Sequence, residues 1–394
     1  MRGIGIDIGA ERHVVAIVDD TDTVQCRATP FAETADGYAT LRKLIGEPAD
    51  TLVALEATGH YWQNLFSFLV SEGFAVALLN PVRTHRFAGE DLARAKTDAI
   101  DAVMLARFAV QKRPAPTRLP DAATQELREL VRLRERWVAE LGTATRRLHR
   151  LVDLGFPEFT QHVATLDSAL ATTLLAAYPS AAAFRTAKPG ALANLRYDGR
   201  HAVGRALATQ LIAAAGTSVG AHQGPAYTLQ VQTLCEDVTR LTQRLRTLEA
   251  GIDRTLGTHA VGQLLTTIDG IGVQTAARLV AELGDPAEFR DAAALAAYVG
   301  VAPATRQSGK RQPRHAPLAP LGHARLRRAL WMPTIVATQR NAWLGAFYRG
   351  LRARGKPAKV ALIAAMRKLL AAIYSVAKHR RPFVPILTPT ERPS

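Results

Sequence analysis

The sequence has few cysteines and lacks a long apolar run. Cys26 and Cys235 are its only cysteines among 394 residues. They match no metal or redox spacing, so a reducing cytoplasm is the expected setting. The best apolar candidate, residues 360–377, is interrupted by Arg367 and Lys368. The chain also enters a strand pattern at once, so we expect neither a membrane-spanning helix nor a signal peptide.

Acidic residues are almost missing from the last quarter of the chain. Residues 301–394 contain 19 Lys and Arg but a single acid, Glu391, a net charge of +18. The whole chain carries +16, so residues 1–300 carry −2. Basic tails also occur as solubility or membrane-surface features. Here the cations alternate with apolar and aromatic residues, which favours a folded basic domain that binds a phosphate backbone.

The first 115 residues alternate between strand and helix patterns. Residues 3–8, 14–18, 51–56 and 74–79 are expected to be strands, and residues 61–71 an amphipathic helix. This order predicts an α/β fold with a mixed sheet covered by helices, the ribonuclease-H-like (RuvC-like) arrangement. Pro114, Pro116 and Pro120 then mark a boundary. We predict three domains, at residues 1–118, 119–258 and 259–394.

The second domain is expected to be helical. Six apolar residues between 234 and 252 follow the 4-3-4-3-4 spacing of a coiled-coil seam, and residues 127–151 carry a similar stripe. Heptads do not reveal the partner, so the two stretches could pair within one chain or between two chains. The Ala-rich region between them, about residues 155–227, contains no chemical motif.

The third domain is expected to be mainly helical, with a helix-hairpin-helix-like turn at Gly270-Ile271-Gly272. The glycines Gly270 and Gly272 would let backbone N–H groups of the second helix approach a phosphate closely. An ordinary turn between two helices is the alternative.

Four carboxylates suggest a metal site. Asp7 and Glu56 each end an apolar strand, and Asp98 and Asp101 share one face of a predicted helix. Two strand ends that meet a helix face can supply oxygen ligands for Mg²⁺ in phosphodiester chemistry. Two alternatives remain. An Asp-x-x-Asp pair is often only solvated charge at a helix start, and Gly-x-Asp-x-Gly also opens sugar-kinase and actin-like folds.

Ser308 lies in the most basic stretch of the chain. The cations around it are Arg306, Lys310, Arg311 and Arg314. They could bind the phosphate under attack and activate the Ser308 hydroxyl, although Ser-Gly is also a common turn. A nucleotide-binding P-loop is excluded because the upstream glycine is missing. Arg325 and Arg327, further on, are predicted to contact nucleic acid as well.

These motifs together resemble those of the insertion-sequence transposases that join an N-terminal RuvC-like DEDD domain to a C-terminal serine domain, the bridge-RNA-guided recombinases. The matching segments are Gly5-Ile6-Asp7-Ile8-Gly9, Leu55-Glu56, Asn80-Pro81, Lys96-Thr97-Asp98 with Asp101, Gly270-Ile271-Gly272, Tyr298-Val299-Gly300 with Pro303, Ser308-Gly309 and Leu326-Arg327. Two positions differ from the family: Asp269 replaces a common proline, and His323 stands where an Asn often follows Gly322.

The resemblance implies a specific mechanism. Asp7, Glu56, Asp98 and Asp101 would hold Mg²⁺, and Ser308 would be the nucleophile that forms a covalent link to DNA. The family also implies a homo-oligomer, a dimer or tetramer, and a noncoding guide RNA. The expected function is therefore a Mg²⁺-dependent DNA transposase or recombinase in a prokaryotic cytoplasm. One alternative is a junction resolvase or DEDD nuclease that uses water, and another is a nucleic-acid-binding protein without catalysis.

Overall fold

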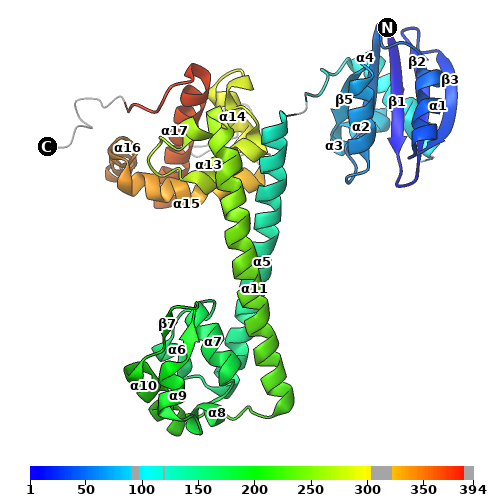
Figure 1. The fold of residues 1–394 in the computed structure, drawn as a ribbon. Coiled ribbons are helices and arrows are strands. Elements are labelled where there is room, and N and C mark those ends of the chain that lie inside the picture. Colours follow the sequence, from blue (N-terminus) through cyan, green and yellow to red (C-terminus); the bar gives the residue numbers. More distant parts are fainter. Residues whose placement is uncertain (91–96, 119, 303–321, 386–394) are drawn as a thin grey trace. The chain divides into compact units, whose positions relative to one another are not determined.

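The described chain forms two compact units. The computed structural model describes residues 1–90, 97–118, 120–302 and 322–385. The two units comprise Met1–Leu119 and Pro120–Ser394, and both are drawn in Figure 1. Hydrophobic cores lie within each unit.

The first unit is built on a five-stranded sheet with the order β3-β2-β1-β4-β5. Its strands are β1 (Arg2–Ile8), β2 (Arg12–Asp19), β3 (Val24–Ala32), β4 (Thr51–Glu56) and β5 (Ala75–Leu79). β1, β2 and β3 pair antiparallel, whereas β4 pairs parallel with both β1 and β5. This mixed sheet confirms the predicted ribonuclease-H-like fold.

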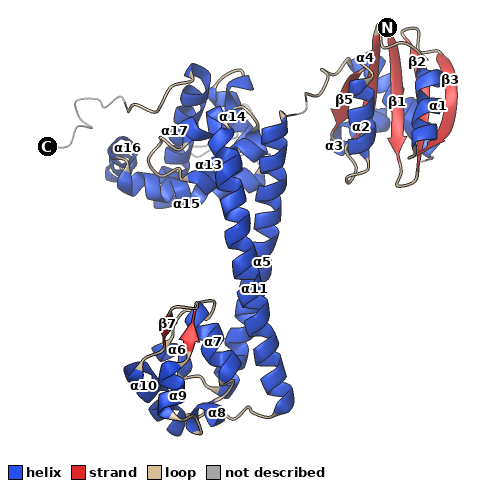
Figure 2. Cartoon of the chain, in the orientation of Figure 1, coloured by secondary structure: helices blue, strands red, loops and turns tan. Residues whose placement is uncertain are grey.

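Helices cover both faces of this sheet (Figure 2). The helices are α1 (Ala35–Ile45), α2 (Trp62–Ser71), α3 (Pro81–Glu90) and α4 (Asp98–Lys112). Ile4 and Ile6 of β1 are buried in a core with residues of α1 and α2. Alternate strand residues such as Leu52 and Ala54 are buried in the opposite core, with Phe87 of α3 and Leu105 of α4. The strand period of two therefore places the two helix pairs on opposite faces.

The second unit contains a long helical stem. Its two helices, α5 (Ala122–Gly155) and α11 (Pro225–Thr258), lie side by side and run antiparallel (Figure 1). Leu127 of α5 shares a core with Ile252 of α11, and further along the stem Ala144 contacts Val238 and Leu241. The predicted seam therefore pairs within one chain, which answers the question that the heptad spacing left open.

A helical lobe closes one end of this stem. Its elements are α6 (Phe159–His162), α7 (Ala169–Ala177), α8 (Ala181–Arg185), α9 (Pro189–Asn194), β6 (Arg196–Tyr197), β7 (His201–Ala202) and α10 (Arg205–Gly216). The rings of Phe156, Phe159 and Phe184 pack together with centroids 5.3 to 6.0 Å apart. The lobe shares its core with the adjoining ends of α5 and α11.

A basic helical domain packs on the other end of the stem. Its helices are α12 (Ala260–Leu265), α13 (Val273–Leu283), the 3₁₀ turn η1 (Pro286–Glu288), α14 (Ala292–Val299), α15 (Ala324–Arg340), α16 (Ala342–Ala353) and α17 (Ala358–His379). Of the helices in the described ranges, α17 alone is long and apolar enough to cross a membrane, but more than half of the apolar stretch is buried. Leu369, Leu370 and Ile373 of α17 belong to the domain core.

The expected elements agree with the structure, but α3 was not predicted, because Asn80-Pro81 was interpreted only as the end of a strand. Three further elements were also missed. β4 has the predicted bounds, and β1, β2, β5 and α2 differ only at their ends. β3, α1 and the β6–β7 hairpin were not predicted. The first residues of β3 do alternate between apolar and polar side chains, but the strand lies at the edge of the sheet, is largely exposed and contains Pro30, which argues against a strand in a sequence pattern.

Candidate active site

Asp7 lies where β1 meets the first turn of α4. The strand alternation of β1 places Gly3, Gly5 and Asp7 on one face of the sheet. A Cβ atom on Gly3 would lie 2.4 Å from the carbonyl oxygen of Ala106, and one on Gly5 would lie 2.0 Å from that of Ala102. The two glycines thus let the backbone of α4 pack directly on β1. Asp7 is the next residue on this face of β1 and therefore lies toward the N-terminal turn of α4.

Asp98 and Asp101 lie in that first turn of α4. Thr97 is the N-cap, and its hydroxyl oxygen accepts a hydrogen bond from the Ile100 backbone N–H at 3.3 Å. This cap starts the helix one residue before Asp98. The helix dipole stabilises carboxylates at this end of a helix. Both acids therefore occupy positions where their charge is tolerated without a cation.

The pKa of Asp7 reflects its neighbours. Burial, followed by the negative charges of Asp101, Asp98 and Glu56, raises the pKa of Asp7 to about 6, while the backbone N–H of Ile8 opposes the change. Like charges that raise the pKa of a carboxyl must be close to it. The structure thus brings the three other predicted acids into the electrostatic environment of Asp7.

Glu56 is held by two threonines. It ends β4, directly after the Ile6–Leu55 pair that joins β1 to β4. The hydroxyl of Thr84, in α3, donates to Glu56 Oε2 at 2.6 Å, and that of Thr58 donates to Oε1 at 3.1 Å. Thr84 is 1 % exposed. Sequence analysis missed Thr84, although Asn80-Pro81 at the start of α3 was a signal for the helix that positions it.

The four acids fit a divalent cation by their chemistry. All are hard oxygen donors, which Mg²⁺ prefers, and a cation would relieve the repulsion that raises the pKa of Asp7. Within the ranges that the structure describes, however, no three His, Cys, Asp or Glu side chains are grouped closely enough to form a metal cage. The fit therefore lies in charge and donor type rather than in a preformed cage.

Ser308 and the cations Arg306, Lys310, Arg311 and Arg314 lie outside the described residues. The residues that precede this segment contact the residues that follow it. The Cα atom of Gly300 lies so close to Gly322 that a Cβ on Gly322 would be 2.4 Å away, and the His323 N–H donates to Tyr298 O at 2.9 Å. His323 also accepts from the Leu326 N–H at 3.3 Å and caps α15, which is a role that Asn performs in many helices.

A buried carboxylate close to these flanking residues contacts two arginines and a histidine. Glu282 of α13 is 7 % exposed. His323 Nε2 lies 3.3 Å from Glu282 Oε2, while Arg132 Nε and Arg325 Nη1 lie 3.4 and 3.5 Å from Oε1. Arg327 Nη1 donates to Val299 O at 3.1 Å. Arg325 and Arg327 are therefore in contact with protein groups close to the residues that flank the Ser308 segment, and their predicted contact with nucleic acid stays a prediction.

The two glycines of the predicted hairpin differ in their surroundings. Gly270 has a φ of 99°, and a Cβ atom there would lie 2.6 Å from the Cβ of Ala337 in α15. Gly272 is the N-cap of α13, and a Cβ atom on it would meet nothing within 4 Å. Packing against α15 thus explains Gly270. The open side of Gly272 leaves room for the predicted phosphate contact.

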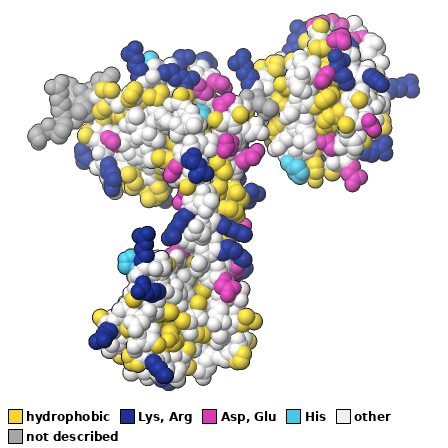
Figure 3. All heavy atoms as spheres, in the orientation of Figure 1, with side chains coloured by type: hydrophobic (Ala, Val, Ile, Leu, Met, Phe, Trp, Pro, Cys, Tyr) yellow, Lys and Arg dark blue, Asp and Glu magenta, His cyan; other side chains and the backbone are white. Residues whose placement is uncertain are grey.

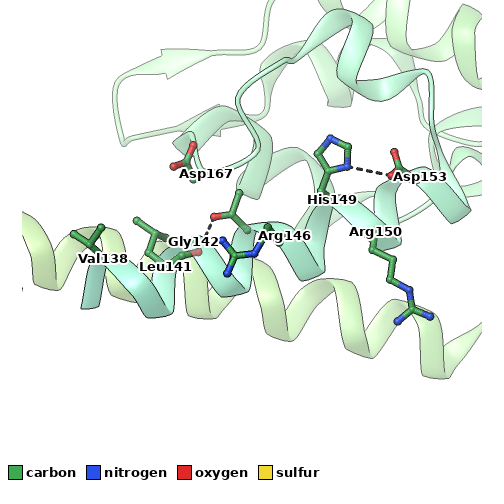
Figure 4. Close-up of a pocket in the computed structure, with 9 residues that line it drawn as sticks. Val138, Leu141, Gly142, Arg146, His149, Arg150, Asp153 and Asp167 are labelled. Carbon is green, nitrogen blue, oxygen red and sulfur yellow. Dashed lines mark hydrogen bonds and ion pairs between the residues drawn. The ribbon is translucent and has the colours of Figure 1, made fainter. Parts of the chain in front are cut away.

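A surface hollow of about 550 Å³ lies elsewhere, along α5 (Figure 4). Its lining includes Val138, Leu141 and Arg146, together with the ion pair between His149 and Asp153 at 3.1 Å. It is open and contains none of the predicted site residues. The predicted chemistry therefore does not lie in this hollow.

Two family models match the chain. A model of DEDD transposases of the IS110 type, described as "Transposase", matches residues 4–157, and one described as "Transposase IS116/IS110/IS902 family" matches residues 262–349. The acids lie within the first range and Ser308 within the second.

Several curated relatives are insertion-element proteins. The chain is 30 % identical over 311 residues to the insertion element IS110 uncharacterized 43.6 kDa protein of Streptomyces coelicolor, covering 78 % of this chain and 76 % of the relative. It is 26 % identical over 386 residues to the pilin gene-inverting protein of Moraxella lacunata, covering 96 % and 97 %. It is also 29 % identical over 327 residues, 78 % and 77 % of the two chains, to the mini-circle putative transposase for IS117 of S. coelicolor. With a ribonuclease-H-like acidic unit, a basic helical domain and these relatives, the chain belongs to the IS110/IS116 family of transposases, enzymes that cut and join DNA.

Proposed function

We propose that this transposase cuts and rejoins DNA through Ser308, with the four acids Asp7, Glu56, Asp98 and Asp101 as ligands of Mg²⁺. The observation that carries the proposal is the raised pKa of Asp7, which is caused by burial and by the other three acids. Such a cluster of like charges lowers the stability of a fold, and clusters of this kind are typical of functional sites. We further propose that the protein works in the prokaryotic cytoplasm as a homo-oligomer.

Each acid has a defined task in this proposal. Asp7 and Glu56 present their oxygens from adjacent parallel strands, and Asp98 and Asp101 present theirs from one helical turn. Thr84 restrains Glu56 through the 2.6 Å hydrogen bond and so fixes the direction of its carboxylate. When bound, Mg²⁺ would stabilise negative charge on the oxygens of the reacting phosphodiester.

Ser308 would carry the covalent step. Its hydroxyl gives up its proton and its oxygen forms a bond to phosphorus, while the bond from phosphorus to the leaving sugar oxygen breaks and that oxygen takes up a proton to leave as a hydroxyl. The reverse reaction with another strand end rejoins DNA without ATP, because the protein–DNA ester conserves the phosphodiester energy. The cations in the surrounding sequence would bind the phosphate under attack.

A noncoding RNA from the same element is the proposed guide. Residues 301–394 carry a net charge of +18, which supports binding of a phosphate backbone but not of one particular sequence. A guide requires that this protein bind its own structured RNA more tightly than unrelated RNA of equal length. Equal affinities at physiological salt would remove the guide from the proposal.

The runner-up is a DEDD nuclease or junction resolvase in which water attacks. The acids support both mechanisms equally, because both need the same metal ligands. Only the covalent intermediate distinguishes them, since water leaves no link between protein and DNA.

The test is denaturing electrophoresis of a reaction stopped during turnover. Wild-type protein should carry covalently attached DNA, and Ser308→Ala should lose this adduct while it still binds DNA. Asp98→Ala and Asp101→Ala serve as matched variants. They should lose strand cleavage and keep the fold, because both side chains lie at the exposed start of α4 rather than in its core. Normal cleavage and rejoining by Ser308→Ala would favour the water-dependent nuclease.

A further inference from the structure

The helical lobe at the end of the stem lies outside both matched family ranges. The first range ends at residue 157 and the second begins at residue 262. The lobe, α6 to α10, falls between them and packs in a core that it shares with the adjoining ends of α5 and α11. Its function is therefore not explained by the acidic site or by the basic domain.

The lobe carries a net positive charge. Residues 159–224 contain five Lys and Arg and two acids, Asp167 and Asp198. The five cations are Arg185, Lys188, Arg196, Arg200 and Arg205, and all of them are exposed. Among the contacts that the structure describes, none of the five forms an ion pair with a carboxylate. Figure 3 shows Lys and Arg side chains over the visible face of the lobe.

One of these acids, Asp198, holds the turn of the hairpin and forms no ion pair with Lys or Arg in the part of the chain that the structure describes. Asp198 Oδ1 accepts from the backbone N–H groups of Arg200 and His201, both at 3.1 Å, and Oδ2 lies 3.0 Å from His201 Nδ1. The hydrogen bond with the His201 side chain, followed by the one from its backbone N–H, lowers the pKa of Asp198. The carboxylate is thus fixed as a turn acceptor, and the guanidinium groups beside it stay available.

The hairpin presents cations and rings on a fixed backbone. Tyr197 pairs with His201 across β6 and β7, and their rings stack with centroids 5.9 Å apart. Arg196 Nη1 donates to the carbonyl oxygen of Arg200 at 3.1 Å, which closes the hairpin. Arg205 follows directly as the first residue of α10, where the helix dipole disfavours a cation. Its charge is therefore explained better by an anionic partner than by helix stability.

We propose that this lobe binds the phosphate backbone of a nucleic acid through Arg200 and Arg205, with Arg185 and Lys188 extending the same basic surface. Cations without a carboxylate partner bind the phosphates of nucleic-acid strands, and a partly exposed Tyr–His pair beside them can add stacking with a base. On α5, Val131 is the last buried residue of the core at one end of the stem. Leu148 is the first buried residue of the lobe core, 17 residues further along the helix. At about 1.5 Å per residue this is roughly 26 Å, so a partner that touches both ends must be extended. DNA and RNA share the required chemistry.

The experiment uses the full-length protein and measures the salt dependence of binding by fluorescence anisotropy. The probes are a duplex DNA and a hairpin RNA with equal numbers of phosphates. In Arg200→Gln/Arg205→Gln, two phosphate contacts are lost, so the slope of log affinity against log salt should fall by about 1.8 for duplex DNA. The same relation gives an affinity loss of about 30-fold at 0.15 M salt.

Two further variants serve as controls. Arg200→Lys/Arg205→Lys keeps both charges and should keep the wild-type slope. Arg27→Gln/Lys43→Gln removes two exposed cations from the first unit and should change neither slope. Arg196 is left in place because it closes the hairpin, and circular dichroism checks that each variant is folded.

The outcome also identifies the nucleic acid. A loss with DNA alone assigns the lobe to duplex DNA, a loss with RNA alone assigns it to structured RNA, and a loss with both assigns it to the shared backbone. If the Gln variant shows the same slope of log affinity against log salt as the wild type with both probes, the proposal is overturned. An acidic protein would then be the partner of this surface. Strand cleavage is not measured, so the result is independent of whether Ser308 is the nucleophile.

Discussion

The substitution Asp7→Asn should stabilise the first unit and abolish strand cleavage. Asp7 is half-buried, and its pKa is raised to about 6 by burial and by the charges of Asp101, Asp98 and Glu56. Asparagine has nearly the same shape and no charge, so it removes the repulsion without leaving a cavity. It also removes a proposed metal ligand, so the cost appears in activity rather than in stability.

The size and the pH range of this effect follow from the pKa. The shift from 3.8 to about 6 corresponds to about 3 kcal/mol as an upper limit, and to about 1 to 2 kcal/mol once water screens the half-exposed carboxyl. An acid whose pKa is higher in the folded than in the unfolded state binds more protons when folded. Its destabilising effect is therefore absent below about pH 4 and complete above about pH 6.

Amide hydrogen exchange in β1 and α4 measures this effect locally, without interference from the second unit. In the absence of divalent metal, Asp7→Asn should slow exchange at pH 8 and leave it unchanged near pH 4. Added Mg²⁺ should protect the wild type and not the variant, because ligand binding stabilises only the form that binds it. Faster exchange in the variant at pH 8 would refute the electrostatic account of the site.

Two further substitutions probe positioning and packing. In single-turnover assays at saturating Mg²⁺, Thr84→Val should reduce cleavage about 10- to 100-fold, as is usual when a residue that orients a metal ligand is lost. Thr58→Val removes the longer hydrogen bond to Glu56 and should reduce cleavage less. Equal effects would mean that Thr84 does not position Glu56. Gly270→Ala should lower the free energy of unfolding by about 1 to 3 kcal/mol through overpacking, whereas Gly272→Ala, which faces open space, should be nearly neutral in chemical denaturation. A neutral Gly270→Ala would show that α15 can move aside.

The elements of the first unit were largely predictable because short-range patterns specify them. The apolar run before Glu56 predicted β4 at its observed bounds, and the spacing of Asp98 and Asp101 predicted their shared helical turn. The structure adds that Thr97 caps that helix, which the sequence analysis did not predict. β3 escaped prediction because it is a largely exposed edge strand that contains Pro30, and proline argues against a strand in a sequence pattern.

The contacts that make a site were not predictable in the same way. The bond from Thr84 to Glu56 joins residues 28 positions apart and depends on how α3 packs beside β4. The heptads of α11 predicted a seam, but only the fold shows that the partner is α5 of the same chain. The cations of the lobe were visible in the sequence, whereas the hairpin that fixes two of them depends on a turn held by Asp198.

The sequence by itself determined the positions of the acids at strand and helix ends and the concentration of positive charge in the last quarter. Both depend only on residue type and on the periods of strand and helix. The tertiary structure decided that Gly3 and Gly5 admit the backbone of α4, so that the acids of its first turn raise the pKa of Asp7. The physical reason is that a pKa and a close approach depend on atoms that are distant along the chain and adjacent only after packing.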